Sequence, residues 1–174
     1  MIKKGFILLL LGTSMLYGNK IDSLYSEHEK LAYSTLGQIG KKFYYKYGLE
    51  PSGVGGSMNE DIKSLFLGLT CNKEASIDDA RKLIVTCAKE YMFEINNNKE
   101  LKPYLHNFPF SEQNIQLSII FKTPLGINNE IGKLSSVEII KGKVIFSANK
   151  TEYTLETVLE ESFEEAVRIV QKGK

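Results

Sequence analysis

Two histidines, His28 and His106, carry most of the acid–base chemistry that this sequence could support. A nucleophilic hydrolase needs a Ser, Thr or Cys beside an imidazole, and a carboxylate or amide that orients the ring. Cys71 and Ser57 are candidate nucleophiles for His106, but no sequence motif joins these residues. His28 falls on the apolar stripe of an expected helix, which is typical of packing at the edge of a core. A hydrolase centred on His106 is therefore an alternative hypothesis.

Metal and paired-carboxylate chemistry have little support in the residue pattern. The histidines are 78 positions apart (28 and 106), and neither belongs to an HExxH motif. The adjacent carboxylates Asp78–Asp79 and Glu160–Glu161 would point apart on a helix, so we expect solvated charges there and no acid–base pair. We expect no catalytic residue, no metal and no cofactor.

The connector 101–110 has the most unusual composition in the chain, because two prolines and three aromatic residues lie in ten positions. Its rings would either fill an open end of the core or line a groove that binds a peptide or another ligand. We predict that it lies beside a glycine-rich loop, 51–57. That loop leaves a helix and enters a strand, the reverse of a phosphate-binding loop, so we do not expect nucleotide binding. The candidate ligand-binding residues are Tyr104, His106, Asn107, Phe108, Phe110, Gly55, Gly56 and Ser57.

Hydrophobic periodicity predicts the elements that must position these residues. Helices are expected at 22–47, capped by Asp22 or Ser23, and at 77–95 and 155–171. Strands are expected at 62–70, 115–121, 134–140 and 143–148. The order α-β-α-β-β-β-α predicts an α+β two-layer sandwich, with helices on one face of a mostly antiparallel four-stranded sheet.

Cys71 and Cys87 are the only cysteines, and an oxidising compartment would favour a bond between them. We place Cys71 at the end of a strand and Cys87 about three turns into the next helix. If that helix runs back over the strand, Cys87 lies over Leu67. The Cα atoms of a disulfide must approach within about 7 Å, so this geometry favours two buried thiols over a bridge.

The first eighteen residues resemble a bacterial secretory signal peptide in their order of residue types. Lys3 and Lys4 precede an apolar run at 6–11, and small or weakly polar residues end the segment. The uncharged stretch spans roughly 22 Å as a helix, less than the roughly 30 Å of a bilayer core, so an uncleaved anchor is the less favoured alternative. We expect cleavage after Gly18, or otherwise after Ser14, and a single α+β domain over 19–174.

Charge and composition narrow the classes of partner. The sequence is 43% hydrophobic and 25% charged, as in an ordinary globular protein, and loss of two leader lysines changes the formal net charge from +1 to −1. A near-neutral domain has no bulk attraction to nucleic acid. The basic and aromatic run at 41–47 could stack bases or rest at a lipid interface, but it is also typical of an amphipathic helix end.

The leading hypothesis is a non-enzymatic binding domain, exported to the periplasm or the exterior, that contacts a protein or a cell-envelope component. Membrane contact is expected only through the leader before its cleavage. A structural protein that pairs with itself through helix 22–47 is a third hypothesis.

Overall fold

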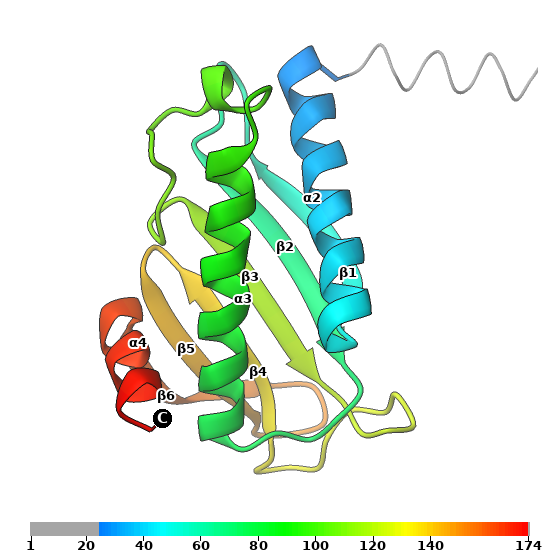
Figure 1. Cartoon of the computed structure of the whole chain (residues 1–174). Helices are drawn as coiled ribbons and strands as arrows, with labels where there is room; N and C mark the ends of the chain where they lie inside the picture. The colour runs from blue at the N-terminus through cyan, green and yellow to red at the C-terminus, as the bar shows by residue number, and fades with distance from the viewer. Residues whose placement is uncertain (1–24, 174) are drawn as a thin grey trace, which may run out of the picture.

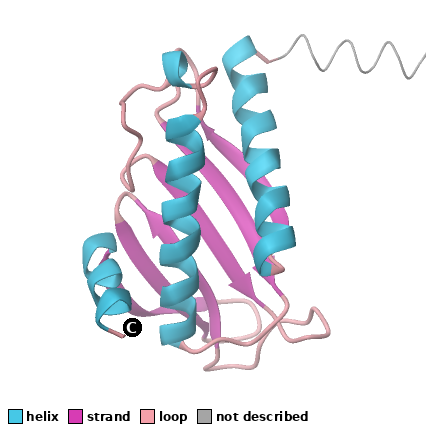
Figure 2. Cartoon of the chain, in the orientation of Figure 1, coloured by secondary structure: helices cyan, strands magenta, loops and turns pink. Residues whose placement is uncertain are grey.

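Three α-helices lie on one face of a six-stranded sheet in the computed structural model, which describes residues 25–173 (Figures 1 and 2). The elements are α2 (Glu27–Tyr47), β1 (Glu50–Ser57), β2 (Ser64–Cys71), α3 (Ile77–Asn97), the short 3₁₀ helix η1 (Lys102–Tyr104), β3 (Ile115–Phe121), β4 (Leu134–Ile140), β5 (Lys143–Asn149), β6 (Leu155–Ser162) and α4 (Phe163–Lys172). The α+β class is confirmed, whereas the predicted four-stranded sheet is wrong. The predicted leader, 1–18, lies outside the described residues.

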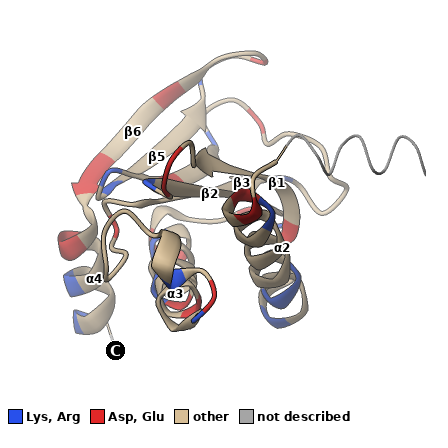
Figure 3. Cartoon of the chain, turned by 90° about the horizontal axis from the view of Figure 1, so that it is seen from above, with Lys and Arg blue, Asp and Glu red and all other residues tan. Residues whose placement is uncertain are grey.

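The strands lie side by side in the order in which they occur in the chain. Every neighbouring pair is antiparallel except β2 and β3, which are parallel and are connected through α3 (Figure 1). Alternate residues of β2 and β3 are buried beneath the helices, and Leu67 is paired with Leu117 at their centre. The view from above shows all three helices on this side, with the opposite face bare of helices (Figure 3).

The long helix α2 begins and ends at strong capping signals. Ser26 accepts a hydrogen bond from the backbone of Glu29, whose side chain accepts one from Ser26 in return. The N-cap is therefore Ser26 and not Asp22 or Ser23. Gly48 ends the helix in the left-handed conformation, with φ of 68°. The apolar stripe of α2 faces the chain's own core, so self-pairing through α2 would have to use its outer face.

The segment predicted as a glycine-rich loop is the edge strand β1, paired antiparallel with β2. Gly53 and Gly55 face the ring of Phe66, which would come within 3.7 Å of a Cβ at Gly53 and 3.9 Å of one at Gly55. A Cβ at Gly56 would meet the carbonyl oxygen of Ser64 at 2.3 Å. Glycine therefore allows the backbone of β2 and the Phe66 ring to lie close to β1. The segment forms a strand even though glycine has a low strand propensity.

The predicted helix 155–171 is two elements, because strand β6 occupies 155–162 and α4 begins only at Phe163. Ser162 caps α4 by accepting a hydrogen bond from the backbone N–H of Glu165 at 3.1 Å. The spacing Ser-x-x-Glu was the sequence signal for this helix start. Leu159, one residue of the stripe that suggested a longer helix, instead packs from β6 against the core.

Glu160 and Glu161 lie on opposite faces of β6, because side chains alternate along a strand. Glu160 is exposed and pairs with Lys143 at 2.7 Å. The side chain of Glu161 is 6% exposed, and its carboxylate accepts hydrogen bonds from Arg81 of α3 at 2.7 and 3.2 Å. The expectation of two solvated charges is therefore wrong for Glu161, which belongs to a buried ion pair.

Both cysteines are free thiols in the structure. Cys87 is buried on α3, as expected, whereas Cys71 is only half-buried at the end of β2. Burial raises the pKa of Cys71, and burial together with the charge of Glu90 raises the pKa of Cys87 to about 12. Neither thiol therefore has the thiolate character that a nucleophile needs.

Candidate functional site

The connector 101–110 lies against the turn between β1 and β2. The backbone N–H of Ile62 donates to the carbonyl of Tyr104 at 2.8 Å, and that of His106 donates to the carbonyl of Ile62 at 3.0 Å. Ser57 ends β1 at the same turn, where its carbonyl accepts from Lys63 at 2.8 Å. The structure therefore brings the two predicted segments side by side, at the end of the molecule where η1 lies (Figure 1).

Both histidines lie at this end. Nδ1 of His106 is 2.5 Å from a carboxylate oxygen of Asp61, which orients the ring as a triad carboxylate would. His28 stacks on Tyr104 with ring centroids 5.7 Å apart and donates through Nε2 to the carbonyl of Met58 at 2.8 Å. The sequence contained no sign of the Asp61 contact.

Neither histidine has a suitable nucleophile among the described residues. Ser26 Oγ is 3.3 Å from Nε2 of His28, but this hydroxyl also caps α2 and donates to Glu29. Cys71 lies at the opposite end of β2 from the histidines, roughly 23 Å along an eight-residue strand. No described Ser, Thr or Cys is hydrogen-bonded to His106. The geometry thus supplies an orienting carboxylate without a reacting group.

The aromatic residues of the connector divide between the core and the surface. Phe110 is buried, and the amide of Asn96 holds its backbone through hydrogen bonds of 2.7 and 2.9 Å. Tyr104, Asn107 and Phe108 are exposed, and Lys102 places its ammonium 3.8 Å from the centre of the Phe108 ring. Of the three aromatic rings, only that of Phe110 is buried in the core.

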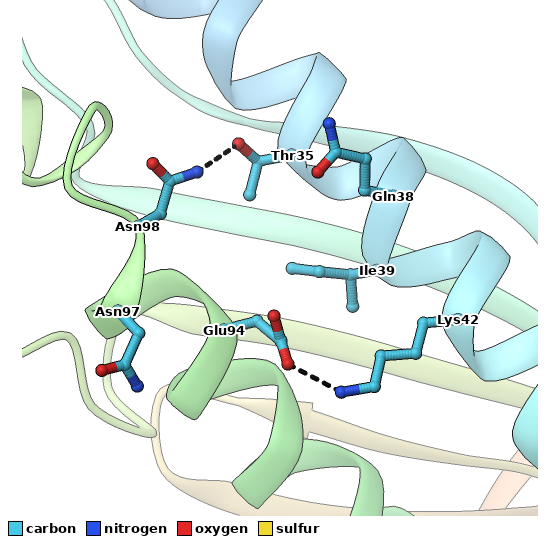
Figure 4. A pocket seen from close by; sticks show the side chains of 7 residues that line it. All are labelled: Thr35, Gln38, Ile39, Lys42, Glu94, Asn97 and Asn98. Atoms are coloured by element: carbon cyan, nitrogen blue, oxygen red, sulfur yellow. Dashed lines mark hydrogen bonds and ion pairs between the residues drawn. The ribbon is translucent and has the colours of Figure 1, made fainter.

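A polar groove of about 340 Å³ runs between α2 and α3 (Figure 4). Thr35 and Asn98 are hydrogen-bonded across it at 2.9 Å, and Lys42 pairs with Glu94 at 2.7 Å. Lys42 also pairs with Glu90 at 2.6 Å. These groups bond to one another, so the groove is a polar seam that joins two helices and leaves few groups for a ligand.

Glu90 is the centre of the ionic network beside this groove. Burial alone would raise the pKa of Glu90, but hydrogen bonds from Lys42, Lys46 and Tyr47 outweigh burial and lower the pKa to about 2. The same contacts raise the pKa of Lys42 and Lys46. The sequence pattern at 41–47 is typical of a helix end and gives no sign of the partners on α3.

The end of the sheet away from the histidines exposes apolar residues on two loops. Leu125 is 84% exposed, Ile127 62% and Ile131 69% on the loop between β3 and β4, and Tyr153 is 86% exposed on the loop between β5 and β6. The backbone N–H of Gly132 donates to the carbonyl of Asn149, the last residue of β5, at 2.8 Å, so the first loop is bonded to the strand end from which the second loop begins. A cavity of about 360 Å³ lies between them. We name residues 123–133 and 150–154 the loop end.

The loop end was not predicted from the sequence, although the sequence contains a signal for it. Three large aliphatic residues lie among turn-forming residues between Phe121 and Leu134, where nothing in the pattern would bury them. The loop between β5 and β6 lies beside these residues because of the order of the strands in the sheet. The sequence alone does not specify that order.

Among residues 25–173, no helix is long and apolar enough to cross a membrane, and no group of three or more His, Cys, Asp or Glu residues could hold a metal ion. Comparison with protein-family models, with curated proteins and with solved structures finds no match to this chain.

Proposed function

We propose that this chain is a non-enzymatic binding domain, exported to the periplasm or the exterior, that contacts a protein partner through the loop end. The observation that carries this proposal is the set of four apolar side chains, each more than half exposed, on two loops that line one cavity. Large exposed apolar patches are rare on monomeric proteins and mark interaction sites, so four such side chains on neighbouring loops favour a docking surface. Export is supported by the order of residue types in the first eighteen positions.

Photo-crosslinking from two aromatic positions at opposite ends of the molecule tests the proposal. A photoreactive phenylalanine analogue replaces Tyr153 at the loop end or, as the matched control, Phe108 in the connector; both residues are exposed. We expect a discrete protein adduct from position 153 in producing cells and none from position 108. The adduct should disappear when Ile131→Ser is added, because that change removes one of the four exposed apolar side chains of the loop end.

Lipid adducts from position 153, or equal protein adducts from both positions, would contradict the proposal. The same purified material tests export, because a cleaved leader leaves Asn19 or Met15 at the N-terminus. Full-length chain with Met1 intact in the soluble cytosol would contradict export.

Hydrolysis centred on His106 is the second candidate function, and the Asp61 contact is the observation that favours it. It predicts ester or peptide hydrolysis by the purified chain that His106→Gln abolishes and His28→Gln preserves. Absence of turnover with ester and peptide substrates would contradict this candidate.

A further inference from the structure

We infer that the cavity at the loop end receives the cationic group of a partner's lysine or arginine side chain. This inference rests on the proposed function and names the chemistry of the contact. It is argued from three features of the cavity: an amide oxygen without a partner, two unpaired carboxylates, and apolar walls.

The amide of Asn129 has a buried acceptor without a donor. Asn129 is 6% exposed and lines the cavity. Its Nδ2 donates to the carbonyl of Leu134 at 2.7 Å, which sets the orientation of the amide. Its Oδ1 accepts no hydrogen bond from any described residue. Buried polar atoms are nearly always bonded, so this orphaned acceptor favours a ligand that carries a donor. The oxygen itself is inaccessible to solvent, and the loops must shift slightly for a donor to reach it.

The cavity lining is acidic and contains no basic residue. Glu130 and Glu152 line it from the two loops, and neither forms an ion pair within residues 25–173. The neighbouring lysines are paired elsewhere, Lys133 with Glu74 at 3.2 Å and Lys150 with Glu156 at 4.0 Å. Two carboxylates and a free amide oxygen together favour a ligand group that carries positive charge and several N–H donors.

The walls favour an organic cation over a metal ion. Ile127 and Ile131 flank the cavity, and their exposed aliphatic surfaces suit the hydrocarbon stem of a lysine or arginine. The described residues contain no cluster of three carboxylate, imidazole or thiolate groups that could hold a metal. Of the lining residues, only Glu130 and Glu152 carry the charged oxygens on which a calcium site depends.

Titration of the ¹⁵N-labelled full-length chain with N-acetyl-arginine amide tests the inference by NMR. Its neutral isostere, N-acetyl-citrulline amide, controls for shape, and calcium chloride controls for metal binding. We expect the arginine probe to shift the side-chain amide signals of Asn129 and Asn149, and we expect neither control to do so.

The double variant Glu130→Gln/Glu152→Gln should bind the arginine probe about tenfold more weakly, since two charge-assisted contacts are lost. The matched control is Glu60→Gln/Glu100→Gln, which changes the charge equally at two exposed sites outside the cavity lining and should leave binding unchanged. Equal binding of citrulline, calcium-induced shifts of the same signals, or full affinity in the Glu130/Glu152 variant would overturn the inference.

Failure of this inference is distinguishable from failure of the proposed function. Protein adducts from position 153 without arginine binding would refute the cationic contact and support the docking surface. Arginine binding without such adducts would support the cation site and refute the proposed function.

Discussion

Gly37 and Gly40, three residues apart on α2, have opposite surroundings. A Cβ at Gly37 would meet no atom within 4 Å, whereas one at Gly40 would meet Pro51 of β1 at 3.1 Å and Leu67 at 3.7 Å. From the sequence, both glycines could mark close packing or a slight bend. Only Gly40 lies at a close approach, because only its side of α2 faces the sheet.

We expect Gly37→Ala to raise the free energy of unfolding by about 1 kcal/mol, since alanine is the better helix former and nothing obstructs it. Gly40→Ala should lower the free energy of unfolding by about 1–2 kcal/mol, because Pro51 would have to move to make room for the added methyl group. Urea unfolding followed by far-UV circular dichroism measures both changes. Stabilisation by Gly40→Ala would show that α2 does not pack closely against β1.

At the scale of elements, the Arg81–Glu161 pair connects α3 to β6. Both side chains are at most 7% exposed, and the guanidinium also bonds to Asp78 and lies 5.4 Å from the centre of the Phe146 ring. Removal of one partner from a buried pair leaves the other charge uncompensated.

Glu161→Gln should therefore lower the free energy of unfolding by about 2–4 kcal/mol. The neighbouring variant Glu160→Gln breaks only an exposed pair and should cost less than about 1 kcal/mol. Thermal and urea unfolding of the two variants provide the measurement. The double variant Arg81→Met/Glu161→Leu should recover most of the loss, and failure to recover it would show that the pair also supplies specific geometry.

The sequence predicted an element correctly where its apolar residues fit only a helical or only an extended spacing. It failed where contacts with distant residues determine the secondary structure. The buried stripes of α2 and α3, strand β3 and the β4–β5 hairpin follow their apolar spacing. β1 was missed because its glycines have low strand propensity, and the Phe66 ring that covers them comes from the next strand. β6 was missed because Leu155, Val158 and Leu159 fit a helical spacing as well as an extended one.

The candidate sites likewise combine features that are visible in the local sequence with contacts that depend on the tertiary structure. The unusual composition of the connector was visible in the sequence, and the structure joins this segment to the β1–β2 turn. The contacts Asp61–His106 and Asn149–Asn129 are not encoded in any local pattern. Each joins segments that meet only after the sheet has formed.

At the scale of the whole molecule, the network around Glu90 joins the two long helices and makes stability depend on pH. Contacts with Lys42, Lys46 and Tyr47 lower the pKa of Glu90 to about 2, below its ordinary value of 4.5. A carboxyl group whose folded pKa is depressed stabilises the fold above its unfolded pKa. That contribution is lost as the pH falls from about 5 towards 2.

We expect Glu90→Gln to lower the free energy of unfolding by about 1–2 kcal/mol at pH 7, with the difference from the parent shrinking towards zero near pH 2. Glu94→Gln is the matched control, because Glu94 contacts Lys42 alone while Glu90 contacts three groups. Its effect at pH 7 should be smaller. Urea unfolding at a series of pH values measures the effect of each variant on the free energy of unfolding. If Glu90→Gln lowered it by the same amount at every pH, the depressed pKa of Glu90 would be contradicted.

Because strand order follows chain order, each strand finds its partner among residues already synthesised. Four of the five strand pairings join consecutive strands through short connections, and only the α3 crossover requires a long loop closure. Pairing between consecutive strands needs only short loop closures, which cost little conformational entropy. During synthesis from the N-terminus, each new strand can therefore add to the edge of the sheet that has already formed, before the C-terminus is made.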